Sequence, residues 1–174
     1  YDNALLASVY VEAFQATGEP FYAQVARETF DYVLGRMTDP RGAFYSTEDA
    51  DSEGVEGKYY VWSLAEVESI LGSTAAKTFA AVYDVTAHGN WEEQNILHLP
   101  ESIGEAARRL GRDATELAED LAASRAKLLA ARDRRVPPGK DTKMLTSWTG
   151  LMIAALADAA HVLNQPKYVV AAEA

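Results

Sequence analysis

The chain has 174 residues, of which 48% are hydrophobic, and its formal net charge is −10. This length suffices for one domain with a sizeable core, whereas the acidic balance argues against binding to nucleic acid phosphates. The absence of cysteine excludes disulfides, thiolate catalysis and cysteine-ligated zinc.

Targeting and cofactor signals are also missing from the sequence. No apolar run reaches the ~18 residues of a membrane span, and no basic segment followed by an apolar one indicates a signal peptide. We therefore expect a cytoplasmic protein without a membrane partner. The glycine-rich nucleotide motifs and the G-x-S-x-G nucleophile motif do not occur, so we expect no cofactor.

The first residues predict a helical hairpin. Asp2 is expected to cap a helix that ends at Gly18, and Pro20 is expected to open a second helix that runs to about Met37. A link this short joins antiparallel neighbours. The inward stripe of the first helix is predicted from its period to be Leu5, Leu6, Val9, Tyr10, Ala13 and Phe14.

An acidic stretch follows the second helix. Residues 43–47 and 58–62 have the aromatic content of short strands, which predicts a β-hairpin. Hairpin loops usually have about two to five residues, so the longer connection between these segments favours a functional role. It carries five carboxylates, namely Glu48, Asp49, Asp51, Glu53 and Glu56.

Helical patterns return after the acidic stretch. Capping boxes at 63–66 and 102–105 predict the starts of two short helices, and a further helix is expected over about 74–83. Residues 84–100 have no helical period and include a strand-like segment, 95–99. A long helix is expected to begin at Asp113 or Thr115 and to end near residue 134.

The end of the chain repeats the pattern of its beginning. Thr146 or Ser147 is expected to cap a helix, and the turn after it resembles the first one, with Asn164 and Pro166 in the places of Gly18 and Pro20. A repeated helix–turn–helix unit predicts an array of αα-hairpins and hence an all-α fold with a small inserted β-hairpin. Because the chain begins directly in a helical pattern and ends within one, we expect it to be a fragment of a longer protein.

Four motifs carry a resemblance to a known family. They are Tyr1–Leu6, residues 42–62, Gly89–Glu92 with Asn95–His98, and residues 141–148 with 150–153. Together they resemble the helical-toroid part of a thioredoxin-domain-containing family that includes a spermatogenesis-associated thioredoxin-like protein. The chain departs from this pattern at Glu93, where the family usually has Gly, and at Thr149, where it usually has Asn.

The resemblance implies a particular architecture. The chain would be a single-domain fragment, residues 1–174, of an (α/α)6 toroid similar to N-acylglucosamine 2-epimerases and six-hairpin glycosidases. The thioredoxin-like domain and the remaining hairpins would lie outside this chain. Apolar helix faces would then be open where the missing hairpins belong, which favours self-association of the fragment.

The acidic stretch has three interpretations. Asp49, Asp51, Glu53 and Gly54 fill the first positions of a calcium loop, but Tyr60 stands where that loop needs a bidentate glutamate, so we expect no metal. The second interpretation is a turn whose carboxylates are simply solvated. The third is a sugar-binding or sugar-converting site, because the flanking aromatic rings can bind the apolar face of a sugar and the carboxylates can bind its hydroxyls. A pair of carboxylates also serves as general acid and base.

The sequence and the resemblance together predict a site for a carbohydrate or other small-molecule ligand. The catalytic candidates are Asp49, Asp51, Glu48 and His98. The substrate-binding candidates are Tyr45, Tyr60, Trp62, Asn90, Trp91, Asn95, Asp141, Lys143 and Trp148.

Two classes of function remain open. The first is a carbohydrate-active enzyme, either an isomerase or epimerase or a glycosidase-like hydrolase. The second is a non-catalytic binding module that serves an attached thioredoxin-like domain. Each tryptophan could instead pack at the edge of a core, and His98 could pack on a strand. The position of the carboxylates distinguishes the two classes of function: an enzyme needs them in a cleft, whereas a convex surface favours a binding module.

Overall fold

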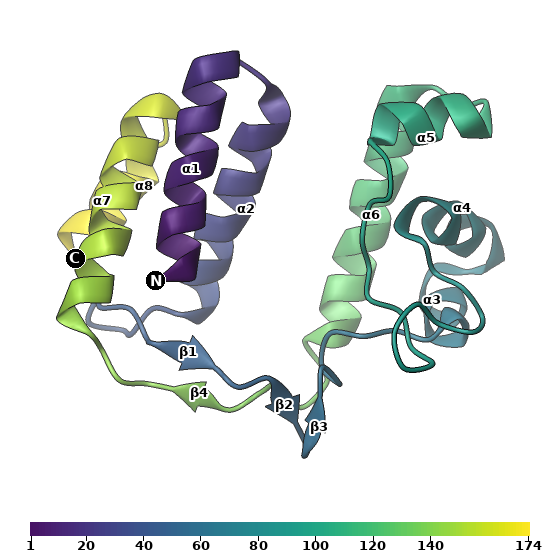
Figure 1. Cartoon of the computed structure of the whole chain (residues 1–174), viewed down its shortest axis with the longest axis horizontal. Coiled ribbons are helices and arrows are strands. Elements are labelled where there is room, and N and C mark those ends of the chain that lie inside the picture. The colour runs from purple at the N-terminus through teal and green to yellow at the C-terminus, as the bar shows by residue number, and fades with distance from the viewer. The chain divides into compact units, whose positions relative to one another are not determined.

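The computed structural model describes all 174 residues and is mostly helical, as the sequence predicted. It contains eight helices and two antiparallel sheets of two strands each (Figure 1). The chain divides into two compact units, and each has its own hydrophobic core. Unit 1 comprises Tyr1–Asp49 and Lys140–Ala174, and unit 2 comprises Ala50–Gly139. None of the helices is both long and apolar enough to cross a bilayer.

Unit 1 consists of two helical hairpins. The first is α1 (Asp2–Thr17) with α2 (Pro20–Arg36), and the second is α7 (Thr146–Val162) with α8 (Pro166–Glu173). Helix α1 packs against both α2 and α7 (Figure 1).

The turns of the two hairpins repeat, as predicted. Gly18 and Asn164 both adopt left-handed backbone, with φ of 71° and 50°. Pro20 and Pro166 each stand in the first turn of the following helix, where the missing N–H has no intrahelical partner to lose.

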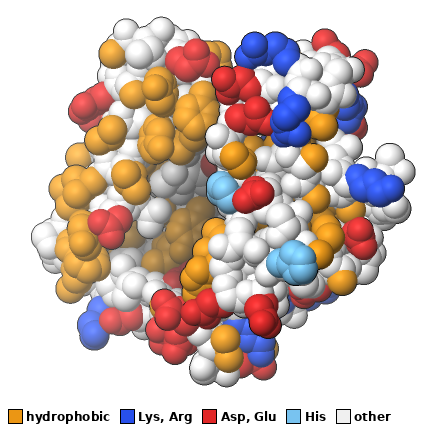
Figure 2. Space-filling model, turned by 45° about the vertical axis from the view of Figure 1, so that its right-hand side comes forward, with side chains coloured by type: hydrophobic (Ala, Val, Ile, Leu, Met, Phe, Trp, Pro, Cys, Tyr) orange, Lys and Arg blue, Asp and Glu red, His pale blue; other side chains and the backbone are white.

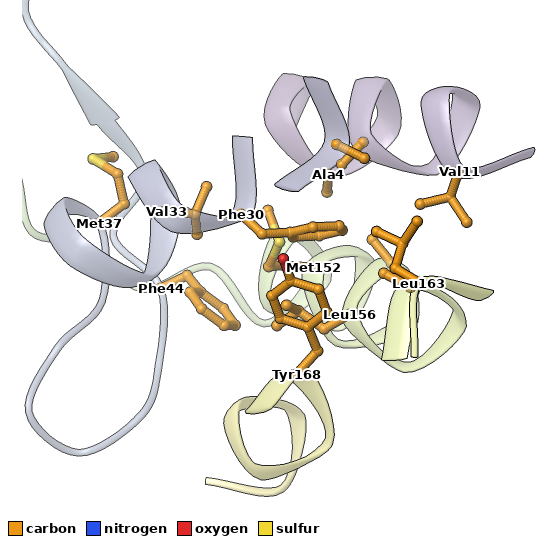
Figure 3. Close-up of a cluster of buried hydrophobic side chains, with 14 of the residues drawn as sticks. Ala4, Val11, Phe30, Val33, Met37, Phe44, Met152, Leu156, Leu163 and Tyr168 are labelled. Atoms are coloured by element: carbon orange, nitrogen blue, oxygen red, sulfur yellow. The ribbon is translucent and has the colours of Figure 1, made fainter. Parts of the chain in front are cut away.

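The core of unit 1 is built where the hairpins meet. The rings of Phe30 and Tyr168 lie 4.9 Å apart between centroids, and both side chains are fully buried. Met152 and Leu156 of α7, in the same hairpin as Tyr168, belong to the same buried cluster (Figure 3). Burial raises the pKa of the Tyr168 hydroxyl. Aromatic side chains from both hairpins therefore form the centre of this unit.

Helix α1 buries a different face from the predicted one. Ala4, Ala7 and Val11 are buried, whereas the large side chains of the predicted stripe, Leu5, Leu6 and Val9, are 48%, 55% and 59% exposed. The reason is that α1 packs against two helices at once, and small side chains allow that close approach. Figure 2 shows apolar side chains gathered on the surface of unit 1.

Two predicted helix caps of unit 1 are wrong. Tyr1 rather than Asp2 occupies the cap position of α1, and Leu145 rather than Thr146 or Ser147 occupies that of α7. Neither makes a side-chain capping bond. Both helices therefore derive their stability from packing rather than from caps.

The predicted β-hairpin between residues 43–47 and 58–62 is wrong. Strand β1 (Thr47–Glu48) pairs with β4 (Lys140–Asp141), and residues 57–60 form a turn. A smaller hairpin, β2 (Asp51–Ser52) with β3 (Val55–Glu56), forms inside the acidic stretch. Its two-residue loop, Glu53-Gly54, has φ of 54° and 77°, which fits the type I′ turn that matches strand twist.

Unit 2 contains four helices, α3 (Leu64–Leu71), α4 (Ser73–Tyr83), α5 (Ile103–Leu110) and α6 (Ala114–Arg132). Both predicted capping boxes, at 63–66 and 102–105, are confirmed, and Asp113 caps α6. Hydrogen bonds from Ser102 lower the pKa of Glu105. The core includes Val67, Phe79, Leu117 and Leu121.

A buried asparagine joins the irregular segment of unit 2 to the start of α3. Asn95 is 1% exposed, and its Nδ2 donates to the carbonyls of Trp62 at 3.0 Å and Thr86 at 3.1 Å. Its Oδ1 accepts from the backbone N–H of Thr86 at 2.9 Å. The predicted strand 95–99 is reduced to a single bridge between Asn95 and Trp62.

We predict that Asn95→Ala lowers the free energy of unfolding by ~1–3 kcal/mol, because it leaves buried backbone groups without partners. The matched control is Asn90→Ala. Asn90 also makes three backbone bonds but is exposed, so water can replace them and the loss should be below ~1 kcal/mol. Urea unfolding measures both, and equal losses would contradict the assignment.

Candidate functional site: a cleft in unit 2

Unit 2 contains a cleft of about 690 Å³. The β2–β3 hairpin, residues 58–61, the turn at residues 91–94 and the segment after α6 provide its walls. Two aromatic side chains, Tyr59 and Trp91, line it. The charged side chains that line it are the acidic Glu53, Glu56, Glu66 and Glu92 and the basic Lys58, Arg134 and Arg135.

Arg135 holds one wall of the cleft in place. Its Nη1 donates to the carbonyls of Tyr59 at 2.9 Å and Val61 at 2.8 Å, and its Nη2 donates to Glu66 Oε1 at 3.3 Å. The guanidinium also lies 4.0 Å from the centre of the Trp62 ring. A planar group with several fixed donors can satisfy a segment that has no ladder partners of its own.

Further contacts tie the segment after α6 to the hairpin side of the cleft. The Tyr59 hydroxyl donates to Asp133 Oδ1 at 3.2 Å, and Arg132 lies 5.2 Å from the Tyr59 ring centre. Ser52 Oγ donates to the carbonyl of Val136 at 2.5 Å. Tyr59 is only 2% exposed. Its role is therefore mainly structural, although it borders the cleft.

Trp91 stands at the start of a tight turn. Gln94 N–H donates to the Trp91 carbonyl at 2.8 Å, and Trp91 N–H donates back to the Gln94 carbonyl at 3.0 Å. The residues between them, Glu92 and Glu93, have φ of 46° and 62°. Left-handed backbone costs a residue with a side chain roughly 1–2 kcal/mol. The turn therefore keeps two strained glutamates beside the tryptophan.

A glycine allows Trp91 to pack where it does. Gly57 has a φ of 69°, and a Cβ added there would lie 3.3 Å from Cζ3 of the Trp91 ring. A side chain at position 57 would therefore press on the ring. Trp91 itself is half-buried. The cleft consequently has an aromatic wall supported from the backbone of the acidic stretch.

Some of the cleft's charges are paired with one another and others are not. Lys58 Nζ lies 2.8 Å from Glu53 Oε2, and Arg135 pairs with Glu66. The side chains of Glu56, Glu92 and Arg134 make no hydrogen bond or ion pair. These three groups are therefore available to a ligand.

Of the predicted site residues in unit 2, Trp91 lines the cleft and the others do not. Trp62 is 3% exposed, and Asn90 and Asn95 bond backbone groups. His98 is exposed, with Nε2 3.6 Å from Asp84 Oδ2. Tyr60 packs edge-on against Tyr59 at 5.0 Å, and Asp51 lies opposite Glu56 in the β2–β3 ladder.

The remaining predicted residues belong to unit 1. The Glu48 side chain is 7% exposed and accepts a hydrogen bond from the Tyr32 hydroxyl at 2.9 Å. Arg36 Nε and Lys140 Nζ lie 3.8 Å and 3.7 Å from its Oε1. Asp49, the next residue, is exposed. Glu48 is therefore a buried carboxylate in the β1–β4 ladder that balances the positive charges of Arg36 and Lys140.

Three more of these residues lie in or next to that ladder, since Asp141 belongs to β4 while Tyr45 and Lys143 lie near its ends. Tyr45 donates to Asp39 Oδ2 at 3.2 Å, and partial burial raises the pKa of its hydroxyl. Asp141 and Lys143 form an ion pair at 2.8 Å, and the hydrogen bond from Lys143 lowers the pKa of Asp141.

The last predicted residue is Trp148, whose ring lies 4.9 Å from that of Tyr1. No group of three or more His, Asp or Glu side chains in the chain is arranged to hold a metal ion.

Sequence reasoning missed most of the cleft. The sequence predicts a helix to about residue 134, but α6 stops at Arg132, and Arg135 reaches back to residues 59–66. Glu92 and Gln94 were overlooked beside Trp91. The available signal was a pair of arginines shortly before Pro137 and Pro138, which prevent the helix from continuing. Charged side chains just beyond a helix end can contact distant segments.

We predict that Arg135→Lys lowers the free energy of unfolding by ~1–3 kcal/mol, because an ammonium cannot reproduce the planar set of hydrogen bonds. Arg134→Lys is the matched control at the neighbouring position. Its side chain has no partner to lose, so we expect a change within ~0.5 kcal/mol. Chemical denaturation measures both, and a neutral Arg135→Lys would rule out the structural role.

No family model matches this chain, but several known proteins are similar to it in sequence. The chain is 36% identical to human and 33% identical to mouse spermatogenesis-associated protein 20 over 194 aligned residues. A Caenorhabditis elegans protein described as uncharacterized is 27% identical and covers 99% of this chain. The human and mouse alignments cover 97% of this chain but 25% of each relative. Nearly the whole chain is thus similar to about a quarter of spermatogenesis-associated protein 20.

Proposed function

We propose that this protein binds carbohydrate in the cleft of unit 2. The observation that carries the proposal is Trp91, a half-buried ring in the wall of a cleft that is also lined by carboxylates, cations and an amide. An aromatic face suits the apolar side of a pyranose. Carboxylates accept hydrogen bonds from sugar hydroxyls, and the Gln94 amide both donates and accepts them. Glu56, Glu92 and Gln94 supply these groups.

Two versions of this function differ in their chemistry. An isomerase, epimerase or glycosidase-like enzyme uses two groups as general acid and base, and the unpaired Glu56 and Glu92 are the candidates for them here. Carboxyl groups that act as acids are usually enclosed, whereas the four glutamates that line this cleft are all exposed. That exposure favours the second version, a binding module that presents a sugar-bearing ligand to an attached thioredoxin-like domain.

We also propose that unit 1 represents two neighbouring hairpins of an (α/α)6 toroid. The repeated turns at Gly18 and Asn164 and the packing of α1 against α7 support it. In such a ring an inner helix is covered by other helices on several sides. Helix α1 fits this position because it is apolar both where it contacts α2 and α7 and on its exposed face. Unit 2 would then be an insertion between consecutive hairpins of one domain, residues 1–174. The open faces also favour self-association of this chain.

The carbohydrate proposal predicts the following for tryptophan variants. Trp91→Ala should weaken binding of any hexose that the wild-type chain binds by about five- to thirtyfold, because stacking on a ring contributes ~1–2 kcal/mol. Trp148→Phe, in unit 1, should leave the affinity unchanged. Calorimetric titration with a panel of neutral hexoses measures both.

Sugar binding and turnover by the wild-type chain and its variants distinguish the possible functions. A wild-type chain that binds no sugar in the panel, or a Trp91→Ala variant that binds as wild type does, would overturn the proposal. Turnover of a bound sugar that is lost in Glu56→Gln or Glu92→Gln would identify the enzyme. Binding without turnover would identify the module.

The toroid proposal makes its own prediction at the exposed face of α1. In this chain Val9→Ser should change the free energy of unfolding by no more than ~0.5 kcal/mol, as at other surface positions. In a chain extended to the length of its relatives, a further hairpin would bury this side chain and the loss should reach ~1.5 kcal/mol. Glu12→Gln, an exposed neighbour, is the control for both. Equal effects of Val9→Ser in the two chains would contradict the toroid.

A further inference from the structure

We propose that the cleft of unit 2 selects a ligand that carries a positive charge beside its hydroxyl groups, such as a sugar with a free amine, and that Glu56 and Glu92 hold this charge. The inference rests on the proposed function and adds the chemical class of the ligand. It also assigns binding roles to two residues that were not among the predicted site residues.

The first argument is the balance of charge that remains after internal pairing. Lys58 is satisfied by Glu53 and Arg135 by Glu66, at 2.8 Å and 3.3 Å. Two carboxylates and one guanidinium are left, those of Glu56, Glu92 and Arg134. The remaining charge is therefore negative, and the chain as a whole carries −10. Both favour cations over anions as ligands.

The second argument is the position of Glu92. Glu92 and Glu93 occupy the same turn and both have left-handed backbone, with φ of 46° and 62°. Neither side chain makes a hydrogen bond or ion pair, so neither repays the strain within the fold. Glu92 lines the cleft and Glu93 does not. A binding role accounts for a charged residue at position 92, and Glu93 provides an almost identical control.

The third argument concerns the aromatic wall. Trp91 directly precedes Glu92, so a ligand that stacks on the ring has a carboxylate at the adjacent position of the chain. A cation near an indole face also gains from the ring quadrupole. Ring and carboxylate thus favour the same type of ligand, one with an apolar face and a positive charge.

The test is a charge series on one sugar ring, measured with this chain by calorimetric titration at a pH where the amine is protonated. The series compares galactose, galactosamine and galacturonate, and in parallel glucose, glucosamine and glucuronate. In at least one series we expect the amino sugar to bind about fivefold more tightly than the neutral sugar, the gain of one partly exposed ion pair, and the uronate to bind most weakly. Raising the salt to about 0.5 M should reduce this preference.

The variants are Glu92→Gln, Glu56→Gln and the control Glu93→Gln. The first two should each remove most of the preference for the amino sugar while binding of the neutral sugar persists, and Glu93→Gln should retain it. Equal binding of the amino and neutral sugars, or tighter binding of a uronate through Arg134, would overturn the charge selectivity and leave carbohydrate binding intact. Absence of binding by every sugar would overturn both proposals.

Discussion

The cleft of unit 2 depends on the contacts of one guanidinium. Arg135 donates to the carbonyls of Tyr59 and Val61 in a segment without ladder partners, and it covers the ring of the buried Trp62. The backbone of Trp62 is in turn bridged to Asn95. Backbone groups that leave regular structure must find donors and acceptors elsewhere. Arginine and asparagine side chains provide them here, and this fixes an irregular wall firmly enough to shape a cleft.

Strain and unpaired charge coincide in the same part of the molecule. The turn after Trp91 holds two glutamates in left-handed backbone, and one of them borders the cleft without an internal partner. Elsewhere in unit 2 the charged side chains are largely used for structure, for example in the capping boxes of α3 and α5. The contrast between structural charges and available charges supports a binding role for the cleft, and it provides Glu93 as a matched control for Glu92.

Unit 1 follows a different packing principle. Helix α1 uses Ala4 and Ala7 against its neighbours and presents Leu5, Leu6 and Val9 outward. Small side chains allow helices to approach closely, whereas large ones give more stability wherever a partner can cover them. A helix that is apolar on opposite faces suits the interior of a larger helical assembly. The chain spans about a quarter of the length of the relatives it matches.

The sequence by itself determined the helices, the capping boxes and the repeated turns at Gly18 and Asn164, because these depend on neighbours within a few residues. It also pointed to Trp91. Only the tertiary structure decided which face of α1 is buried, that Thr47 pairs with Asp141 rather than with residues near Trp62, and that Arg135 reaches back to Val61. These choices depend on contacts between segments far apart in the chain, and a local period carries no information about which distant partner a side chain will meet.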